Sequence, residues 1–351
     1  MKTSVLKIDP AAPDAELMAR AGAVIKRGGL VAFPTETVYG LGGDALNPEA
    51  SKKIYAAKGR PSDNPLIVHI ADFESLKPVV REIPEAAVRL AERFWPGPLT
   101  MIFRKTELVP YETSGGLDTV AVRMPDHPTA LALIRAGGGY IAAPSANASG
   151  RPSPTMADHV LEDLGGRIEM ILDSGHVEIG LESTIVDLTE DVPVILRPGF
   201  INLNMLAETV GEVRIDPGIT EDGEAKQVRP KAPGMRYRHY APKAPLTIVE
   251  GSRSAVTAKI NELAAEAARA GRKAGVLAAE ENADLYRGAH VFRVGSRACE
   301  ETIAQHLFQV LRESDAMGFD VLYSESFDTP EMGMAIMNRL LKAAGHQVIT
   351  V

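Results

Sequence analysis

The sequence predicts an α/β protein with two domains. Short apolar strands alternate with amphipathic helices over the first 210 residues, and the alternation resumes with a cleaner period from residue 245. Between them, at 211–244, the apolar periodicity is lost and Asp, Glu, Lys, Pro and Gly dominate. A chain of 351 residues is also too long for one average domain. We therefore expect domains at 1–210 and 245–351, joined by a linker.

The first domain opens with a predicted strand, helix and strand. Thr3–Ile8 alternates as a strand, and Asp14–Arg27 carries apolar residues at helical spacing. Leu30–Phe33 is typical of a buried strand that ends at a proline. The glycines at 40, 42 and 43 predict a turn in which the backbone can approach a ligand closely.

The remaining elements of the first domain follow the same alternation. Asn47 caps a helix that has Pro48 at its first position and runs to about Ala57, and an irregular loop covers 58–65. The predicted strands are Leu66–Ile70, Thr100–Phe103, Thr119–Met124, Tyr140–Pro144, Met170–Leu172, Ser183–Leu188 and Val194–Leu196, with further helices at Pro128–Arg135 and Leu203–Val210.

The second domain is predicted as a smaller Rossmann-like unit. Its predicted strands are Leu246–Val249, Gly275–Ala278, Val291–Val294, Val321–Ser324 and Gln347–Val351, with helices over 256–267, Ile303–Ala316 and 334–341. Because strands and helices alternate, crossover helices and a mostly parallel sheet are expected.

Composition and missing motifs exclude several classes of function. The formal net charge of -8 argues against binding nucleic acid by bulk attraction. A single cysteine, Cys299, excludes an internal disulfide framework and a cysteine-rich zinc site, and the eight histidines are scattered. No apolar run reaches the roughly 18 residues of a spanning helix, and no signal peptide opens the chain, so a cytoplasmic protein is expected. No P-loop, HExxH or GxSxG occurs, and no GxGxxG opens either domain.

Two pairs of polar residues in loops suggest a phosphate site. Lys58 and Arg60 are two apart in the loop 58–65, where they suit a phosphate chain, although a solvated basic loop has the same pattern. Ser145 and Asn147 follow the strand Tyr140–Pro144, where they suit either ligand contact or turn capping. Since ligands gather at the carboxyl ends of strands, this loop should lie beside the one after Phe33.

An arginine at the end of a buried strand requires an anionic partner. Arg123 ends Thr119–Met124, and its partner is either a protein carboxylate or a bound one; Arg197 repeats the pattern. Thr35, Glu36 and Thr37 suit strand-end hydrogen bonding as well as ligand contact. By residue type alone, His69 is a core histidine bonded to backbone.

Taken together, these segments resemble the YrdC domain of threonylcarbamoyl-AMP synthases. The resemblance rests on the run Phe33–Gly42, the Lys58-x-Arg60 and Ser145-x-Asn147 pairs, Trp95–Thr100, Val122–Pro125, Glu182–Thr184 and Leu196–Gly199. The linker signature at 232–242 and the second domain point to the longer, two-domain form. The resemblance implies a twisted, open, mixed sheet flanked by helices for the first domain, and covers essentially the whole chain.

The resemblance also implies a reaction. Members of this family make threonylcarbamoyl-AMP and pyrophosphate from L-threonine, bicarbonate and ATP, for the t6A37 modification of tRNA. ATP is expected to bring Mg²⁺ with it, because no carboxylate cluster for a metal is readable here. A downstream threonylcarbamoyl transferase machinery is implied as the recipient, and weak direct binding of tRNA is left open.

Residue roles follow from the same resemblance. Lys58, Arg60, Ser145 and Asn147 are implied as the catalytic, phosphate-neutralising set. The implied ATP-binding residues are those four with Asn64, Thr119, Ser153, Arg197 and Tyr240. The implied threonine pocket consists of Thr35, His69, Arg123, Ala143 and Ser183, with Arg123 meeting the carboxylate of the amino acid. The linker residues Tyr237, His239 and Tyr240 are expected to fold over the active site.

Two alternatives compete with this interpretation. One is a related enzyme that forms carbamoyl adenylate, but those chains carry zinc-binding and acylphosphatase-like segments that this sequence lacks. The other is a non-catalytic RNA-binding module, which the acidic composition and the complete set of phosphate residues disfavour.

Overall fold

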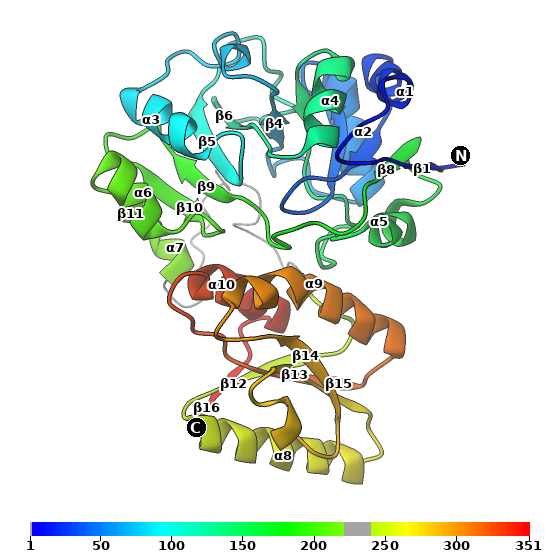
Figure 1. The fold of residues 1–351 in the computed structure, drawn as a ribbon, viewed down its shortest axis with the longest axis vertical. Coiled ribbons are helices and arrows are strands. Elements are labelled where there is room, and N and C mark those ends of the chain that lie inside the picture. The colour runs from blue at the N-terminus through cyan, green and yellow to red at the C-terminus, as the bar shows by residue number, and fades with distance from the viewer. Residues whose placement is uncertain (1, 221–239) are drawn as a thin grey trace. The chain divides into compact units, whose positions relative to one another are not determined.

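The structure, a computed structural model, describes residues 2–220 and 240–351. These residues form two compact units (Figure 1). The first comprises 2–149, 153–178 and 182–220, and the second comprises 150–152, 179–181 and 240–351. Within the described ranges, none of the helices combines the length and the apolar character needed to cross a membrane.

The first unit is built on an 11-stranded sheet with strand order β1-β8-β2-β3-β7-β4-β6-β5-β9-β10-β11. Its strands are β1 (Ser4–Lys7), β2 (Val31–Phe33), β3 (Gly40–Asp44), β4 (Ile67–His69), β5 (Leu99–Arg104), β6 (Thr119–Arg123), β7 (Ile141–Ala142), β8 (Met170–Asp173), β9 (Thr184–Asp187), β10 (Val194–Arg197) and β11 (Arg214–Ile215). Parallel and antiparallel pairs are mixed, as in β4 with β6 and β5 with β6. The predicted mixed α/β sheet is confirmed.

Helices flank this sheet. They are α1 (Ala15–Lys26), α2 (Pro48–Lys58), α3 (Glu85–Phe94), α4 (Pro128–Gly137), α5 (Ala157–Leu164), α6 (Leu203–Val210) and α7 (Pro217–Thr220). Helices α1 and α4 pack against one another, as do α3 and α6 (Figure 1). The predicted cap Asn47 accepts a hydrogen bond from the backbone N–H of Glu49, with Pro48 in the first turn. Helix α5 was not predicted from the sequence, although its buried residues recur at helical spacing.

The glycines at 40, 42 and 43 do not form the predicted turn. They belong to β3, which pairs antiparallel with β2. A Cβ on Gly42 would lie 2.9 Å from the Phe33 ring and 2.9 Å from Ile141. The missing side chains therefore make room for packing inside the sheet, which a local reading of glycine cannot distinguish from a turn.

Three further boundaries differ from the prediction. The strand expected at Tyr140–Pro144 shortens to β7, which pairs antiparallel with both neighbours. β11 and α7 lie inside the range 211–244 that we predicted as a linker, and β11 pairs in parallel with β10. Residues 221–239 of that range lie outside the described residues.

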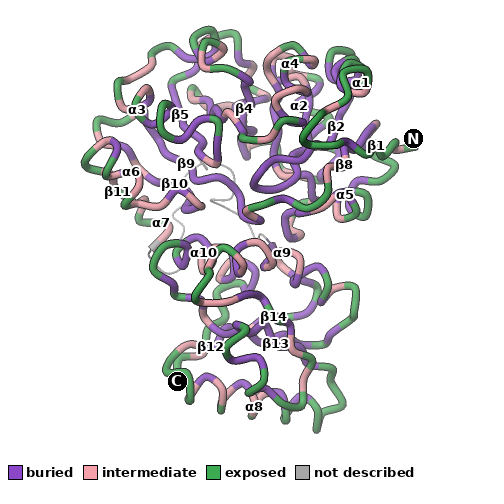
Figure 2. The backbone as a smooth tube through the Cα atoms, viewed as in Figure 1, coloured by how far each residue is buried: buried purple, intermediate pink, exposed green. Residues whose placement is uncertain are grey.

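The central strands of the first unit have two different faces. One face contributes residues such as Val68, Val122 and Met101 to the large apolar core. The opposite face carries a small apolar cluster of Ile67, Ile102, Ala121, Ile185 and Leu196. Because side chains alternate along a strand, His69, Thr100 and Arg123 lie on the face of the small cluster. Figure 2 shows that the central strands of this sheet consist of buried residues.

The second unit is a five-stranded, fully parallel sheet with order β14-β13-β15-β12-β16. Its strands are β12 (Leu246–Glu250), β13 (Ala274–Ala279), β14 (His290–Gly295), β15 (Val321–Glu325) and β16 (Val348–Thr350), and its longer helices are α8 (Arg253–Arg269), α9 (Glu300–Met317) and α10 (Gly333–Ala344). The predicted parallel sheet with crossover helices is confirmed.

Candidate active site

Three residues of the predicted phosphate set meet in the structure. Lys58 is the last residue of α2, and its side chain is buried. The Lys58 ammonium donates to the backbone carbonyls of Ser145 and Asn147, the latter at 2.5 Å, and lies 3.4 Å from Asn147 Oδ1. The Ser145 hydroxyl donates to the same Oδ1 at 2.6 Å. A buried ammonium held by carbonyl dipoles keeps a positive charge in place for an anion.

Backbone pairing around Gly40 explains why the two predicted loops are neighbours. Gly40 pairs with Phe33 in β2 on one side and forms an antiparallel bridge with Ser145 on the other. The N–H of Ala146 donates to the Tyr39 carbonyl at 2.8 Å, which extends the bridge. The expected proximity of the loops after Phe33 and Pro144 is confirmed.

Arg60 and Asn64 fold onto their own loop. Arg60 Nη2 donates to the carbonyl of Pro65 at 3.2 Å and to that of Asn64 at 3.4 Å, and its side chain is half-buried. Asn64 is buried, and its Oδ1 accepts no hydrogen bond from the described residues. An orphaned buried amide oxygen is unfavourable, so this position suits a donor from a ligand or water.

Arg123 lies beside a protein carboxylate. From the residues alone, the predicted partner was either a protein carboxylate or a bound one, and the resemblance then implied the carboxylate of the substrate. Arg123 Nη2 lies 2.8 Å from Glu36 Oε1, and both side chains are only 5% exposed. The geometry is that of an ion pair without a hydrogen bond. Among the described residues, both Glu36 oxygens and Arg123 Nη2 lack a hydrogen-bond partner. Glu36 is therefore an anionic partner of Arg123 within the chain, and the role of Arg123 in binding the threonine carboxylate stays a prediction.

Glu36 is the functional candidate that sequence reasoning missed. It was grouped with Thr35 and Thr37 as a strand-end residue, and its acidic charge beside a predicted binding loop was a signal that did not by itself identify Arg123 as its partner. His127 is a second neighbour of Glu36. Burial lowers the His127 pKa, and the Glu36 charge partly opposes that effect. His127 Nδ1 is also buried without a hydrogen-bond partner in the described chain.

His69 is a neutral imidazole beside Arg123. The parallel register of β4 and β6 pairs the two residues directly. Burial, and then the positive charge of Arg123, lower the His69 pKa to about 3. Its Nδ1 lies 3.1 Å from the Ile67 carbonyl, and its ring meets Phe33 edge-on at 6.0 Å between centroids. His69 is thus a core histidine by its contacts that also lies beside the buried ion pair.

A β-bulge brings Arg197 to Ser183. In β10, Ile195 pairs with Val186 and Arg197 pairs with Ile185, so one extra residue is inserted. The bulge turns Arg197 to the face of the small apolar cluster. There its Nε donates to the Ser183 carbonyl at 3.0 Å and its Nη2 to the Ser183 hydroxyl at 3.1 Å. Thr100 pairs with Arg123, and its hydroxyl contacts the Ser183 hydroxyl at 2.8 Å.

Three other residues predicted for the site are Thr35, Ala143 and Thr119. The Thr35 hydroxyl is buried in its own turn, where it donates to the Val38 carbonyl at 2.7 Å. The Ala143 N–H donates to the backbone carbonyl of Ile67 at 2.8 Å. Thr119 begins β6, at the opposite end of that strand from Arg123.

Two predicted nucleotide residues have side chains engaged elsewhere. Ser153 is fully buried and donates to Glu182 Oε1 at 2.5 Å. The Tyr240 ring is buried in the second unit and packs on Phe308 at 5.0 Å between centroids. The expected cover from Tyr237 and His239 lies outside the described residues. In the described parts of the chain, no group of three or more His, Cys, Asp or Glu side chains could hold a metal ion.

Comparisons with known proteins cover both units. Residues 23–199 match the family model described as "Telomere recombination", and residues 201–345 match "Threonylcarbamoyl-AMP synthase, C-terminal domain". The chain is 52% identical over 331 residues to the threonylcarbamoyl-AMP synthase of Pyrococcus abyssi, covering 94% of this chain and 95% of that protein. It is 50% identical to the synthase of Bacillus subtilis, covering 95% of this chain and 94% of that one.

A solved structure also resembles the whole chain. The crystal structure of P. abyssi Sua5 complexed with L-threonine superposes with a TM-score of 0.93 at 49% identity, covering 99% of this chain and 100% of that one.

Proposed function

The chain belongs to the threonylcarbamoyl-AMP synthase family, and on that premise we propose how its residues perform the synthesis. The enzyme makes threonylcarbamoyl-AMP and pyrophosphate from L-threonine, bicarbonate and ATP, which is the first step of the t6A modification of tRNA. Threonine is its amino-acid substrate, in keeping with the threonine complex of the P. abyssi relative.

The proposal rests on two buried cations. Each lies beside groups that suit a different part of the substrates. Lys58 lies among the carbonyls of Ser145 and Asn147, and Arg123 lies beside His69 and Glu36. Lys58 holds a positive charge among carbonyl oxygens, which suits a phosphate, and Arg123 keeps an N–H without a described acceptor beside its ion pair with Glu36, which suits a carboxylate. We assign the Lys58 end to the phosphates of ATP and the Arg123 end to threonine.

At the threonine end, Arg123 would bind the α-carboxylate. Its Nη2 donates to no described residue, which leaves that N–H for a ligand oxygen. The neutral His69 would offer a hydrogen bond without repelling Arg123 or the threonine ammonium, because its pKa of about 3 keeps it uncharged. Ser183, Thr35 and Ala143 would complete the pocket through hydroxyl and backbone groups.

Glu36 would hold the threonine ammonium. The carboxylate and ammonium of an α-amino acid share one carbon, so an ammonium lies close to any group that binds the carboxylate. Glu36 is buried beside Arg123, and its two oxygens have no described hydrogen-bond partner. The ammonium must lose a proton before the amine can attack bicarbonate or carbon dioxide. Glu36 would orient the amine and accept that proton.

At the phosphate end, the residues would position ATP and neutralise charge. The carbamate oxygen attacks the α-phosphorus and pyrophosphate leaves, so no protein nucleophile is required. Lys58 and Arg60, with Ser145 and Asn147, would bind the phosphates as negative charge develops on the leaving group. We propose the remaining nucleotide contacts at Asn64, Thr119, Ser153 and Arg197.

Mg²⁺ would enter bound to ATP and would supply charge neutralisation at the phosphates. The described residues around Lys58 offer mainly cations and neutral oxygens, which fits a metal held by phosphate and water more than by the protein. We also propose the cytoplasm, where ATP and tRNA are available, as the place of action, with a downstream threonylcarbamoyl transferase as recipient of the adenylate.

Pyrophosphate release tests this assignment. The purified full chain is incubated with ATP and Mg²⁺, with threonine and bicarbonate supplied together or singly, and pyrophosphate is measured. Release that depends on both supports the proposal. Release that requires neither, or no release at all, contradicts it.

A further inference from the structure

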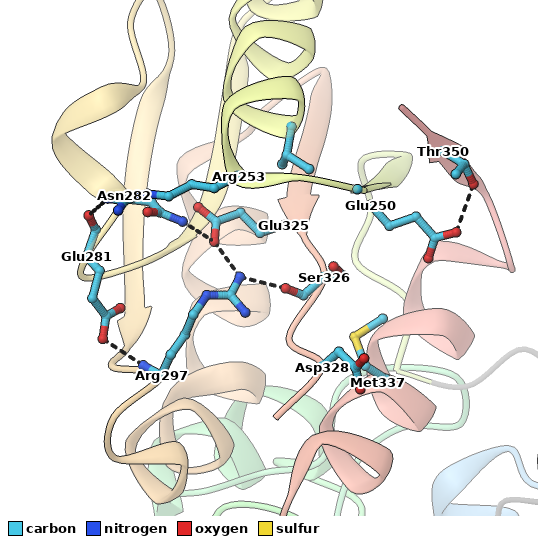
Figure 3. A pocket seen from close by; sticks show the side chains of 12 residues that line it. Glu250, Arg253, Glu281, Asn282, Arg297, Glu325, Ser326, Asp328, Met337 and Thr350 are labelled. Carbon is cyan, nitrogen blue, oxygen red and sulfur yellow. Dashed lines mark hydrogen bonds and ion pairs between the residues drawn. The ribbon is translucent and has the colours of Figure 1, made fainter. Parts of the chain in front are cut away.

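A second pocket lies wholly within the C-terminal unit, at the carboxyl ends of its five parallel strands (Figure 3). Its volume is about 790 Å³, inside the range of roughly 300–1,000 Å³ common for small-ligand sites. Every strand contributes a lining residue at or just beyond its end: Glu250, Asn282, Arg297, Glu325 and Thr350. Open parallel sheets bind ligands at this edge, and no role in the synthase reaction is assigned to it above.

The lining disfavours a nucleotide. Four carboxylates, of Glu250, Glu281, Glu325 and Asp328, face two guanidinium groups, of Arg253 and Arg297, so the pocket has a formal excess of negative charge. The turn from β12 to α8 has one glycine, Gly251, where a Cβ would lie 2.1 Å from the carbonyl oxygen of Val351. That glycine is explained by packing of the chain end and leaves no glycine-rich phosphate loop.

Arg297 provides a fixed anion-binding group. Its Nη2 donates to Glu325 Oε2 and to the Ser326 carbonyl, each at 2.7 Å. Glu325 is itself held by Asn282 at 3.0 Å and by the Tyr286 hydroxyl at 2.7 Å. Arg297 Nε and Nη1 donate to no described residue, and the side chain is 34% exposed. The guanidinium is therefore rigid while its free N–H groups remain available to a carboxylate.

Two carboxylates provide a cation-binding group on the opposite side of the pocket. Glu250 and Asp328 line the pocket, and Figure 3 shows both on the other side of it from Arg297, with the Glu250 carboxylate turned toward Thr350. Glu250 uses one oxygen to accept from the Thr350 hydroxyl at 2.8 Å. Neither its second oxygen nor the Asp328 carboxylate accepts a hydrogen bond from the described residues. An ammonium between them would offset two negative charges.

We propose that this pocket binds a free amino acid as a zwitterion, with its ammonium at Glu250 and Asp328 and its carboxylate at Arg297. The positive charge of Arg297 lies apart from the negative charges of Glu250 and Asp328. These charges match the carboxylate and the ammonium of one small molecule. A polyamine would leave Arg297 unused, and a polyphosphate would face the acidic side of the pocket.

Met337 gives a local probe, because it lines the pocket and its sulfur accepts from the Phe327 N–H at 3.1 Å. The full chain is labelled with methyl-¹³C methionine, and the Met337 signal is assigned from Met337→Leu. Each of the twenty amino acids, and separately spermidine and ATP, is then titrated. We expect at least one amino acid to shift the Met337 signal saturably, and spermidine and ATP to leave it unchanged.

Charge-removing variants test where the ligand binds. Glu250→Gln with Asp328→Asn should weaken that binding about tenfold or more, because charged hydrogen bonds are lost while the neutral amides keep the shape. Arg287→Met, an exposed arginine of the same unit, is the matched control and should bind normally. The proposal is overturned if no amino acid shifts Met337, if the double variant binds as well as the parent, or if spermidine or ATP gives the shift that the double variant abolishes.

Discussion

Arg123 and Glu36 form a buried ion pair in which the charges approach to 2.8 Å while hydrogen-bonding groups on both sides stay unused. A pair that served stability alone would normally satisfy those groups, because a buried polar atom without a partner is costly. The unused N–H and oxygens are the groups that a zwitterionic substrate would need. Under the assignment proposed above, the pair would link the stability of the fold to the binding of threonine.

Arg123→Ala should raise the threonine concentration for half-saturation by orders of magnitude. Removing one member of a desolvated ion pair costs on the order of 3–5 kcal/mol. Steady-state pyrophosphate release at varied threonine measures the effect. Arg104→Ala, which removes an exposed arginine from the neighbouring strand β5, should saturate as the parent does. Near-normal threonine saturation of Arg123→Ala would remove Arg123 from the threonine pocket.

Glu36→Gln should lower kcat about a hundredfold or more, because proton transfer by a positioned group contributes on that order. The amide keeps the size of the side chain and removes its charge, so the apparent KM for ATP should change little. Glu16→Gln, on the exposed side of α1, serves as the control.

A structural role for Glu36 predicts a different pattern. If Glu36 only neutralises Arg123, the variant should lose stability while the kcat of the folded fraction persists. The double variant Glu36→Gln, Arg123→Met should then regain stability, since replacing a buried ion pair as a whole is often neutral. Chemical unfolding of the single and double variants, measured beside kcat, separates the two roles.

His69 should make the fold less stable as the pH falls below about 6.5. Its pKa is about 3 in the folded state, mainly through burial, against about 6.5 when unfolded. Between these values the unfolded chain binds a proton that the folded chain does not, so stability is fully present above about 6.5 and declines toward about 3 by up to about 1.4 kcal/mol per pH unit.

His69→Gln removes this titration. We expect the unfolding free energy of the variant to depend less on pH between about 4 and 6.5 than that of the parent, measured by denaturant titration at each pH. His176→Gln, at an exposed position, should keep the slope of the parent. Equal slopes for the parent and His69→Gln would show that other groups cause the acid sensitivity.

Local sequence pattern predicted most elements of the fold because helices and buried strands have their own periodicity. Helix Leu203–Val210 matches to the residue, and Asn47 caps its helix as predicted. The glycines of β3 were misread, because the reason for their small size is the Phe33 ring, from a strand whose pairing with β3 the local pattern does not reveal. Tertiary packing, and not the local pattern, therefore explains why these residues are glycines.

In the candidate site, too, the sequence predicted some residues but not the contacts that depend on tertiary structure. Lys58 and the Ser145-x-Asn147 pair could be selected from residue type and resemblance, and the structure brings them together. Glu36 could not be matched with Arg123 without knowing that the loop after β2 reaches β6. The contact between Arg197 and Ser183 depends on a one-residue bulge, which alternation along a strand does not reveal.

Lys58→Ala should leave a folded protein that no longer releases pyrophosphate. Its ammonium holds carbonyls of Ser145 and Asn147, so the loop is expected to loosen locally, while the apolar core of the unit is unaffected. Lys52→Ala, an exposed lysine of the same helix, is the matched control, because it removes only surface ion pairs with Glu49 and Glu112. Circular dichroism checks the fold, and pyrophosphate release with threonine, bicarbonate and ATP checks the chemistry. Turnover of Lys58→Ala equal to that of Lys52→Ala would mean that the phosphates are neutralised elsewhere, and the cluster around Asn147 would then be a structural device that closes the loop after β7 onto α2.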